Sequence, residues 1–244
     1  MNVMSVPVVL HGSSRLDVEP EVQELGDFLI RNPQYIEYVA GIIVECKTAS
    51  QLQEYLEDEG SAIYALSYRD QLGTLMNLLR NFYQGPKLEQ NRGRLLEYLT
   101  GAAIPFQDGW EYENKRYHVR FVWSETNLPV VEGAKHDLDV AAIGRVDEDV
   151  VCEGYECKVF LENMVYWVEG RFRGPDERKI DFMVDLEKQL TNAKIKTEIG
   201  FVTFKDSAER FVRILQKLKG CTLTVRMPRE LSQRLAIRRD CKGD

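Results

Sequence analysis

Apolar residues recur at helical spacing through most of the first 86 residues. Residues 32–47 predict a helix in which Asn32 is the N-cap and Pro33 holds the first position. A second helix is predicted to end at the break before Pro86, and its apolar stripe consists of Leu72, Leu75, Met76, Leu79 and Tyr83. Weaker patterns suggest short helices near 22–30 and 52–57, and strands at 6–10 and 61–68. We therefore interpret residues 1–86 as a mostly helical N-terminal domain.

After Pro86 the apolar pattern alternates between the period of helices and that of strands. The predicted order is a helix, three strands, a helix, a strand, a helix and a last strand, which indicates an α/β (α+β) domain over residues 87–228. Its final helix has clear end signals, because Asp206 and Glu209 have the spacing of a capping box and Gly220 follows the last apolar turn. The expected elements are a helix at 93–103, strands at 115–123, 137–144 and 154–161, a helix at 177–193, a strand at 197–204, a helix at 206–220 and a strand at 221–227.

Composition and charge narrow the classes of function. The formal net charge of -7 argues against a protein that coats nucleic acid non-specifically, because neutralising phosphates requires a surplus of Lys and Arg. Residues 229–244 are nevertheless rich in Arg and could form either a nucleic-acid arm or a solvated basic tail. Five cysteines without a C-x-x-C pair indicate neither a disulfide framework nor a zinc ribbon. No apolar run reaches the roughly 18 to 20 residues of a membrane span, so we expect a cytoplasmic protein with no membrane partner.

Charged residues interrupt two of the apolar strand segments. Residues two apart in a strand point to the same side, so Asp137 and Asp139 share one face, and Glu156 and Lys158 share a face of the following strand. Neighbouring strands can thus bring three carboxylates and an ammonium group together, and carboxylates that repel one another are usually compensated by a cation. Oxygen ligands of this kind suit Mg²⁺ or Mn²⁺. The alternative interpretation is a solvated network of cross-strand ion pairs.

Other Glu-x-Lys triplets show that the letters alone decide nothing. Glu45 and Lys47 repeat the letters Glu-Cys-Lys, but they lie at the end of a predicted helix, where side chains two apart diverge by about 200°. Two further triplets, at 113–115 and 177–179, fall in a polar stretch and at the start of a helix. Only the triplet 156–158 follows an apolar strand that carries an aspartate at a suitable distance.

With this arrangement the chain resembles the PD-(D/E)xK, or restriction-endonuclease-like, nuclease superfamily over residues 88–227. The common core of that superfamily is a helix, three antiparallel strands, a helix and a strand. Its motif is an acidic residue on the second strand followed by Glu/Asp-x-Lys on the third. The matching residues are Asp139 in "DLDVAAIG" and Glu156 and Lys158 in "YECKVFL", although no proline precedes the aspartate. The resemblance implies a restriction-endonuclease-like mixed sheet flanked by helices.

The resemblance also implies roles for single residues. Asp139 and Glu156 would bind Mg²⁺ or Mn²⁺ with the main-chain carbonyl of Cys157 as a further ligand, and Lys158 would be the catalytic lysine. Glu97 matches a glutamate that many members add from the first core helix. The implied activity is hydrolysis of phosphodiester bonds, in DNA in preference to RNA, by a metal-activated water. The superfamily also contains inactive members, so the alternative is a nuclease-fold module that binds nucleic acid or a protein partner.

Basic and aromatic residues alternate after the third strand. Arg171, Arg173 and Lys179 lie near aromatic residues of the segment 166–172, a combination that suits phosphate contact and base stacking. We expect this segment to contact the substrate if the chain is a nuclease, and the alternative is a hairpin whose aromatic side chains pack into the core. His118 is interpreted as an isolated strand or surface histidine. Many such nucleases dimerise, so a homodimer or a protein partner is compatible with the sequence.

Overall fold

A mixed sheet forms the centre of the fold. The computed structural model describes residues 6–58, 71–133, 135–221 and 223–240. Six strands of this part of the chain follow the order β1-β2-β3-β4-β7-β8, in which β1 to β4 are antiparallel and β4, β7 and β8 are parallel. The strands are β1 (Val8–Ser13), β2 (Tyr112–Trp123), β3 (Leu138–Val146), β4 (Asp149–Cys157), β7 (Lys196–Val202) and β8 (Thr224–Arg226).

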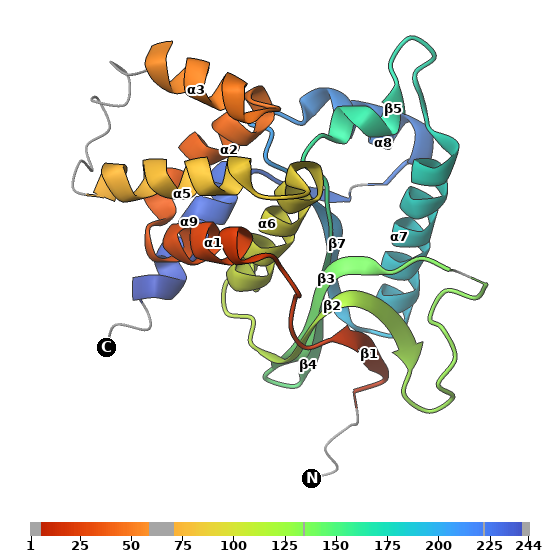
Figure 1. Ribbon diagram of the computed structural model, residues 1–244. Coiled ribbons are helices and arrows are strands. Elements are labelled where there is room, and N and C mark those ends of the chain that lie inside the picture. Colours follow the sequence, from red (N-terminus) through yellow and green to blue (C-terminus); the bar gives the residue numbers. More distant parts are fainter. Residues whose placement is uncertain (1–5, 59–70, 134, 222, 241–244) are drawn as a thin grey trace.

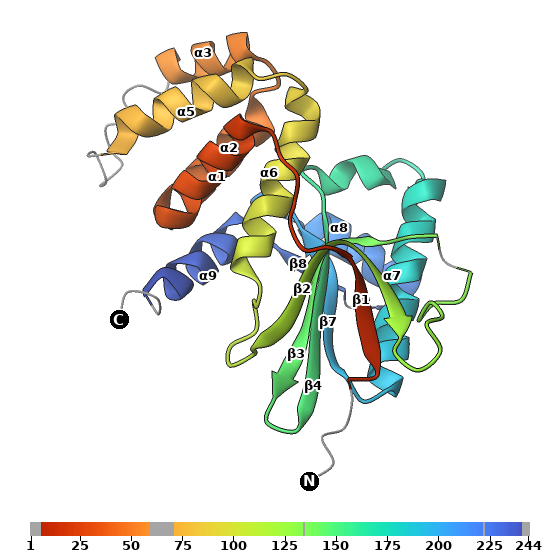
Figure 2. The ribbon, with the colours of Figure 1, turned by 60° about the horizontal axis from the view of Figure 1, so that its bottom comes forward.

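Helices cover both faces of the sheet (Figure 1). One face carries α1 (Pro20–Arg31), α2 (Ile36–Glu45), α3 (Ala49–Asp58), α5 (Leu72–Gln84), α6 (Leu88–Ala103) and α9 (Pro228–Asp240). The opposite face carries α7 (Gly174–Asn192) and α8 (Glu209–Lys219), and Figure 2 shows these two helices on the far side of the sheet from α9. The fold is therefore of the α/β class, as the sequence predicts.

The long apolar runs of the central strands are explained by burial on both faces. In β3, Val140 and Ala142 pack into the cluster below α6, whereas Ala141 and Ile143 pack into the cluster below α7. A strand covered on both sides reads as a continuous apolar run rather than as an alternating one. A charged side chain within such strands is costly unless it is paired and hydrogen-bonded.

Within the described residues, the expected helices and strands occur near their expected positions, and two strands differ in their bounds. The strand expected at 154–161 is β4, which ends at Cys157, and residues Leu161–Met164 form a 3-10 turn. The strand expected at 6–10 is β1, shifted to Val8–Ser13. The strand expected at 61–68 lies outside the described residues.

Neither predicted side-chain cap forms. Asn32 holds the N-cap position of a 3-10 turn at Pro33–Tyr35 that runs directly into α2, and Pro33 takes the first position as expected. The Asn32 side chain does not cap this turn, because its amide donates instead to the Phe28 carbonyl of α1 at 2.9 Å. Helix α8 begins only at Glu209 and has no side-chain cap, so Asp206 is not part of a capping box. The end signal was correct, because Gly220 follows α8 with a φ of 61°.

The C-terminal basic segment belongs to the packed structure. Leu231 and Leu235 of α9 are buried in the cluster that also holds the N-terminal helices and α6. Arg234 donates to Asp108 at 2.6 Å, and Arg238 donates to the Ala102 carbonyl at 2.9 Å. Residues 228–240 are therefore neither a solvated tail nor a free arm. Their leucines are buried in the core, and their arginines bind the last turn of α6 and the segment that follows it.

Candidate active site

Asp139 and Glu156 meet where β3 begins and β4 ends. Val140 pairs with Tyr155 in the antiparallel register, so the next position outward sets Asp139 opposite Glu156. The Oδ2 atom of Asp139 accepts a hydrogen bond from the Cys157 main-chain N–H at 2.7 Å. The Glu156 side chain is only 4% exposed. The strand geometry thus brings the two expected acidic residues together.

Lys158 joins this pair from the residue after the strand. Its main-chain N–H donates to the Val202 carbonyl of β7 at 2.9 Å, which extends the pairing by one residue. Its Nζ atom lies 3.0 Å from Oε1 of Glu156, so the two side chains share a side as expected. Burial opposes the charged form of Lys158, but Glu156 and Asp139 outweigh it, and the pKa of the ammonium group is raised above its ordinary value. Lys158 therefore carries a positive charge at neutral pH.

A second lysine reaches the same carboxylate from α7. Nζ of Lys179 lies 2.6 Å from Oε2 of Glu156 and also donates to the main-chain carbonyl of Asp137. The Lys179 side chain is 14% exposed, which is low for a lysine. From the sequence, Lys179 was expected to contact the substrate. The contact between Lys179 and Glu156 could not be predicted, because it depends on how α7 packs against β4.

Glu97 approaches the site from α6. Its Oε2 atom forms an ion pair with Arg94 at 2.8 Å, and Nε2 of His118 lies 3.8 Å away. Burial is the main cause that raises the pKa of Glu97, and Glu156 adds to it, although Arg94 and His118 act against it. Glu97 is thus electrostatically coupled to the Asp139–Glu156 pair across the end of the sheet.

His118 is a strand histidine whose ring has a hydrogen-bond partner, as the sequence predicts, but it is not isolated, because it contacts Arg94 and Glu97 of α6. It occupies a left-handed conformation with a φ of 50° in β2, which is uncommon for a residue other than glycine. Nη1 of Arg94 lies 2.6 Å from its Nε2 atom, within hydrogen-bond distance. The pairing of β2 with β1 is irregular at this point, and the irregularity turns His118 toward α6. The sequence pattern of β2 does not indicate such a bulge.

The carboxylates at this edge repel one another. Burial first, and then repulsion from Glu156 and Glu97, raises the pKa of Asp139 to about 8. Oε2 of Glu156 is buried and has no hydrogen-bond partner among the described residues. The Lys179 ammonium group is close enough to this oxygen for an ion pair, but its geometry is not that of a hydrogen bond. A buried acceptor of this kind fits a cation, and two carboxylates suit a hard divalent ion.

Asp139 and Glu156 alone do not form a complete set of metal ligands. Among the described residues, no group of three or more His, Cys, Asp or Glu side chains is arranged as it stands to hold a metal ion. The Cys157 thiol lies 3.5 Å from the Thr100 hydroxyl on the α6 side, and burial raises its pKa well above the ordinary value. Of the two donor groups of Cys157, the main-chain carbonyl is therefore the one that could join Asp139 and Glu156 as a ligand.

Two comparisons of the sequence with known proteins find no match. A scan finds no protein-family model that matches this chain, and a search of curated proteins finds no significant match. Within the described residues, none of the helices combines the length and apolar character needed to cross a membrane.

The expected substrate-contacting segment forms a small hairpin of β5 (Val165–Tyr166) and β6 (Arg171–Phe172). The guanidinium groups of Arg171 and Arg173 lie 4.7 and 5.4 Å from the centre of the Tyr166 ring. Phe172 is fully buried and Trp167 is partly buried against the same core cluster, so the alternative of aromatic core packing holds for these two residues. No hydrogen bond or ion pair within the described part of the chain joins the two arginines to the carboxylates. Of the three expected substrate contacts, only Lys179 reaches them.

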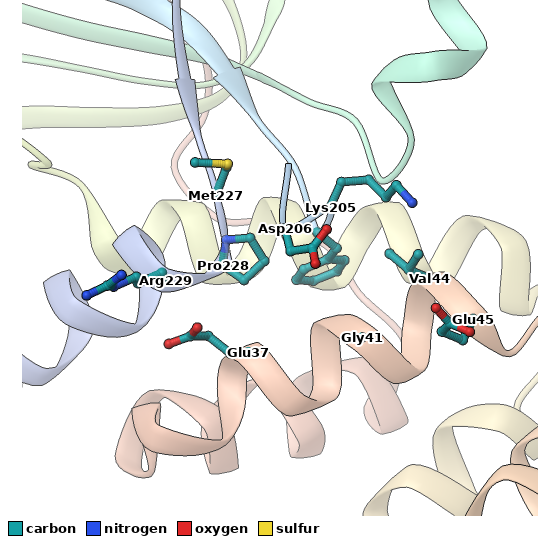
Figure 3. A pocket seen from close by; sticks show the side chains of 10 residues that line it. Glu37, Gly41, Val44, Glu45, Lys205, Asp206, Met227, Pro228 and Arg229 are labelled. Carbon is teal, nitrogen blue, oxygen red and sulfur yellow. The ribbon is translucent and has the colours of Figure 1, made fainter. Parts of the chain in front are cut away.

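A cavity of about 440 Å³ lies at the same edge of the sheet, between α2 and the segments that follow β7 and β8 (Figure 3). Glu37 and Glu45 line it from α2, whereas Lys205 and Arg229 line it from the opposite side. The carboxyl ends of parallel strands are a common place for ligands. Because acidic and basic side chains both line this cavity, it does not by itself favour an anionic ligand.

Proposed function

We propose that the chain is a divalent-metal-dependent nuclease that hydrolyses phosphodiester bonds, in DNA in preference to RNA. The observation that carries this proposal is the convergence of Asp139, Glu156 and Lys158 at one end of β3 and β4. A buried, repelling carboxylate pair beside a charged, partly exposed lysine suits metal-assisted phosphoryl chemistry better than it suits a structural ion pair. A surface ion-pair network would leave these carboxylates solvated.

The order of elements supports the proposal. Helix α6 is followed by the antiparallel strands β2, β3 and β4, and then by α7 and β7. This is the order expected from the resemblance to the restriction-endonuclease-like superfamily. Asp139 and Glu156 lie on the second and third of these strands, and Lys158 directly follows the third. Among the described elements, the strands β1 and β8 and the helices α1, α2, α3, α5, α8 and α9 are additions to that core.

Each side chain has a distinct task in the proposed reaction. Asp139 and Glu156 would hold Mg²⁺ or Mn²⁺ together with the carbonyl of Cys157. A divalent ion bound there would lower the pKa of a bound water and polarise a phosphoryl oxygen. Lys158 is 37% exposed, so its charge can reach a substrate phosphate and stabilise the negative charge that develops in the transition state. Glu97 would hold the Arg94 guanidinium group in place beside the site through their ion pair.

The substrate would approach from the hairpin side of α7. Tyr166 is 42% exposed with two guanidinium groups over its ring, and Arg210 lies 4.2 Å from the Trp167 ring centre. Exposed aromatic rings beside cations suit base stacking and phosphate contact. The overall charge of -7 confines such contacts to local patches.

The test combines metal binding with cleavage. Calorimetry with Mn²⁺ and Mg²⁺ is expected to show binding by the wild type and none by Asp139→Ala combined with Glu156→Ala. Linear, nicked, branched and single-stranded substrates are then screened with Lys158→Ala, which should lose cleavage, and with Lys47→Ala as a matched control. Lys47 follows the same letters Glu-Cys at an exposed site outside the cluster, so its variant should cleave normally.

One observation favours a second function. Lys179 already neutralises Glu156 from inside the fold, as expected for an inactive nuclease-fold module that binds nucleic acid or a protein. That function predicts no divalent-ion binding by the wild type at millimolar concentration and an unchanged fold in the double alanine variant. The same calorimetry therefore separates the two functions.

A further inference from the structure

Glu156 is held by two ammonium groups, one on each oxygen. Lys158 approaches Oε1 at 3.0 Å and Lys179 approaches Oε2 at 2.6 Å. The two lysines differ in their surroundings, because the Lys158 side chain is 37% exposed and that of Lys179 is 14% exposed. Lys158 is thus free to turn toward solvent, whereas Lys179 is packed between α7 and the start of β3.

The position of Lys179 is the one a metal ion would need. Oε2 of Glu156 is buried and accepts no hydrogen bond, so the ammonium group is its only counter-charge among the described residues. Asp139, the other proposed ligand, faces Glu156 across the strand pair. A divalent ion shared by these two carboxylates would lie close to the Lys179 charge, and like charges at such short range repel strongly.

We propose that Lys179 is a built-in competitor for the metal: it occupies the cation position on Glu156, and a divalent ion binds only when Lys179 leaves Oε2. This inference rests on the proposed function, because it concerns the loading of the same site. The main-chain carbonyl of Asp137, to which Lys179 also donates, keeps a partner for the ammonium group after it leaves. Lys179 thereby sets the ion concentration at which the site fills and protects the buried carboxylate until then.

A competing role and a structural role of Lys179 predict opposite changes in metal affinity when the lysine is removed. If Lys179 only supported the fold, its removal would loosen Glu156 and weaken metal binding. If it competes, its removal strengthens metal binding by about tenfold or more, since one neighbouring charge commonly changes proton binding at a carboxylate by that factor. Lys158→Met serves as the matched comparison, because it removes a charge at similar distance from Glu156 and leaves Oε2 blocked.

The experiment measures Mn²⁺ binding by calorimetry on the EDTA-treated full chain. Lys179→Met is expected to bind at least about tenfold more tightly than the wild type, and Lys158→Met is expected to gain clearly less. Lys179→Gln retains a donor for the Asp137 carbonyl and should behave like Lys179→Met, which guards against misfolding of either variant. Thermal unfolding without Mn²⁺ should show a lower midpoint for Lys179→Met, and its rise on adding Mn²⁺ should exceed that of the wild type.

The outcomes separate this inference from the proposed function. Equal or weaker Mn²⁺ binding by both Lys179 variants, with normal binding by the wild type, overturns the competitor role and leaves the nuclease proposal intact. An equal gain in Lys158→Met also overturns it, because charge alone would then explain the effect. Binding by none of the proteins at millimolar Mn²⁺ overturns the metal site and the competitor together.

Discussion

Replacing Asp139 by Asn should stabilise the protein in the absence of a divalent ion, although it should abolish the proposed activity. The asparagine amide has nearly the same shape, and its oxygen can still accept the Cys157 N–H that Asp139 accepts at 2.7 Å. What the substitution removes is a carboxylate that burial, Glu156 and Glu97 all disfavour in its charged form.

The size of the effect follows from the pKa of Asp139 in the two states. The folded protein raises this pKa from 3.8 to about 8, so the folded state binds a proton that the unfolded state has released at neutral pH. A raised pKa means that stability is fully present below 3.8 and is lost as the pH rises toward 8. At about 1.4 kcal/mol per unit, roughly 4 kcal/mol is lost by pH 7. Since the amide also loses hydration, we expect Asp139→Asn to gain roughly 2 to 4 kcal/mol at that pH.

Urea unfolding in EDTA at about pH 4.5 and pH 7.5 measures this gain. The difference in unfolding free energy between Asp139→Asn and the wild type should be small at the lower pH and should grow to several kcal/mol at the higher one. Asp185→Asn, an exposed carboxylate on α7, should stay within about 0.5 kcal/mol of the wild type at both. A pH-independent difference, or a loss of stability at high pH, would refute the electrostatic account. Adding Mn²⁺ should stabilise the wild type and Asp185→Asn, but not Asp139→Asn.

Two further substitutions test the packing around the site. Leu231→Ala in α9 should cost about 2 to 5 kcal/mol of unfolding free energy, because Leu231 is fully buried, whereas Ile237→Ala on the same helix, at 49% exposure, should be nearly neutral by urea unfolding. Gly200→Ala should cost about 1 to 3 kcal/mol or more, because an added Cβ would lie 2.2 Å from the Thr224 carbonyl oxygen and force β7 and β8 apart. Its control is Gly73→Ala, where nothing lies within 4 Å of the added Cβ and a gain of up to about 1 kcal/mol is expected. Similar thermal midpoints for Gly200→Ala and Gly73→Ala would contradict the clash.

The strands and the pairing of Asp139 with Glu156 could be predicted because they follow from local periodicity. A period of two fixes which side of a strand a residue faces, and a short connection between two strands makes them neighbours. The register then follows within a residue or two. The end of β4 at Cys157 was harder to predict from the sequence. Lys158 continues the pairing with β7 by one hydrogen bond, and the chain turns away only after it.

Contacts between distant segments could not be read from the sequence. Lys179 meets Glu156 because α7 packs across the sheet, and His118 meets Glu97 because β2 bulges at that residue. Neither event leaves a periodic signal. The C-terminal helix shows the same limit: its arginines read as a basic tail, yet Leu231 and Leu235 at i and i+4 are the helical spacing that buries it.

A second buried carboxylate pair in the same sheet shows why the site differs from ordinary buried charge. Glu153 accepts the main-chain N–H groups of Phe106 and Gln107 at 2.9 Å each, and Glu198 accepts a pair of bonds from Arg226 at 2.7 and 2.8 Å. Every carboxylate oxygen there has a donor, as buried polar groups normally do.

Glu156 lies only three residues from Glu153 on β4, and its Oε2 atom lacks any hydrogen bond within the described residues. The fold can thus satisfy a buried carboxylate fully, and it does so away from the strand ends. Where β3 begins and β4 ends, it instead leaves Asp139 and Glu156 repelling each other, with a lysine as the counter-charge of Oε2. The difference between the two pairs is the strongest physical reason to seek an exchangeable cation at Asp139 and Glu156 and none at Glu153 and Glu198.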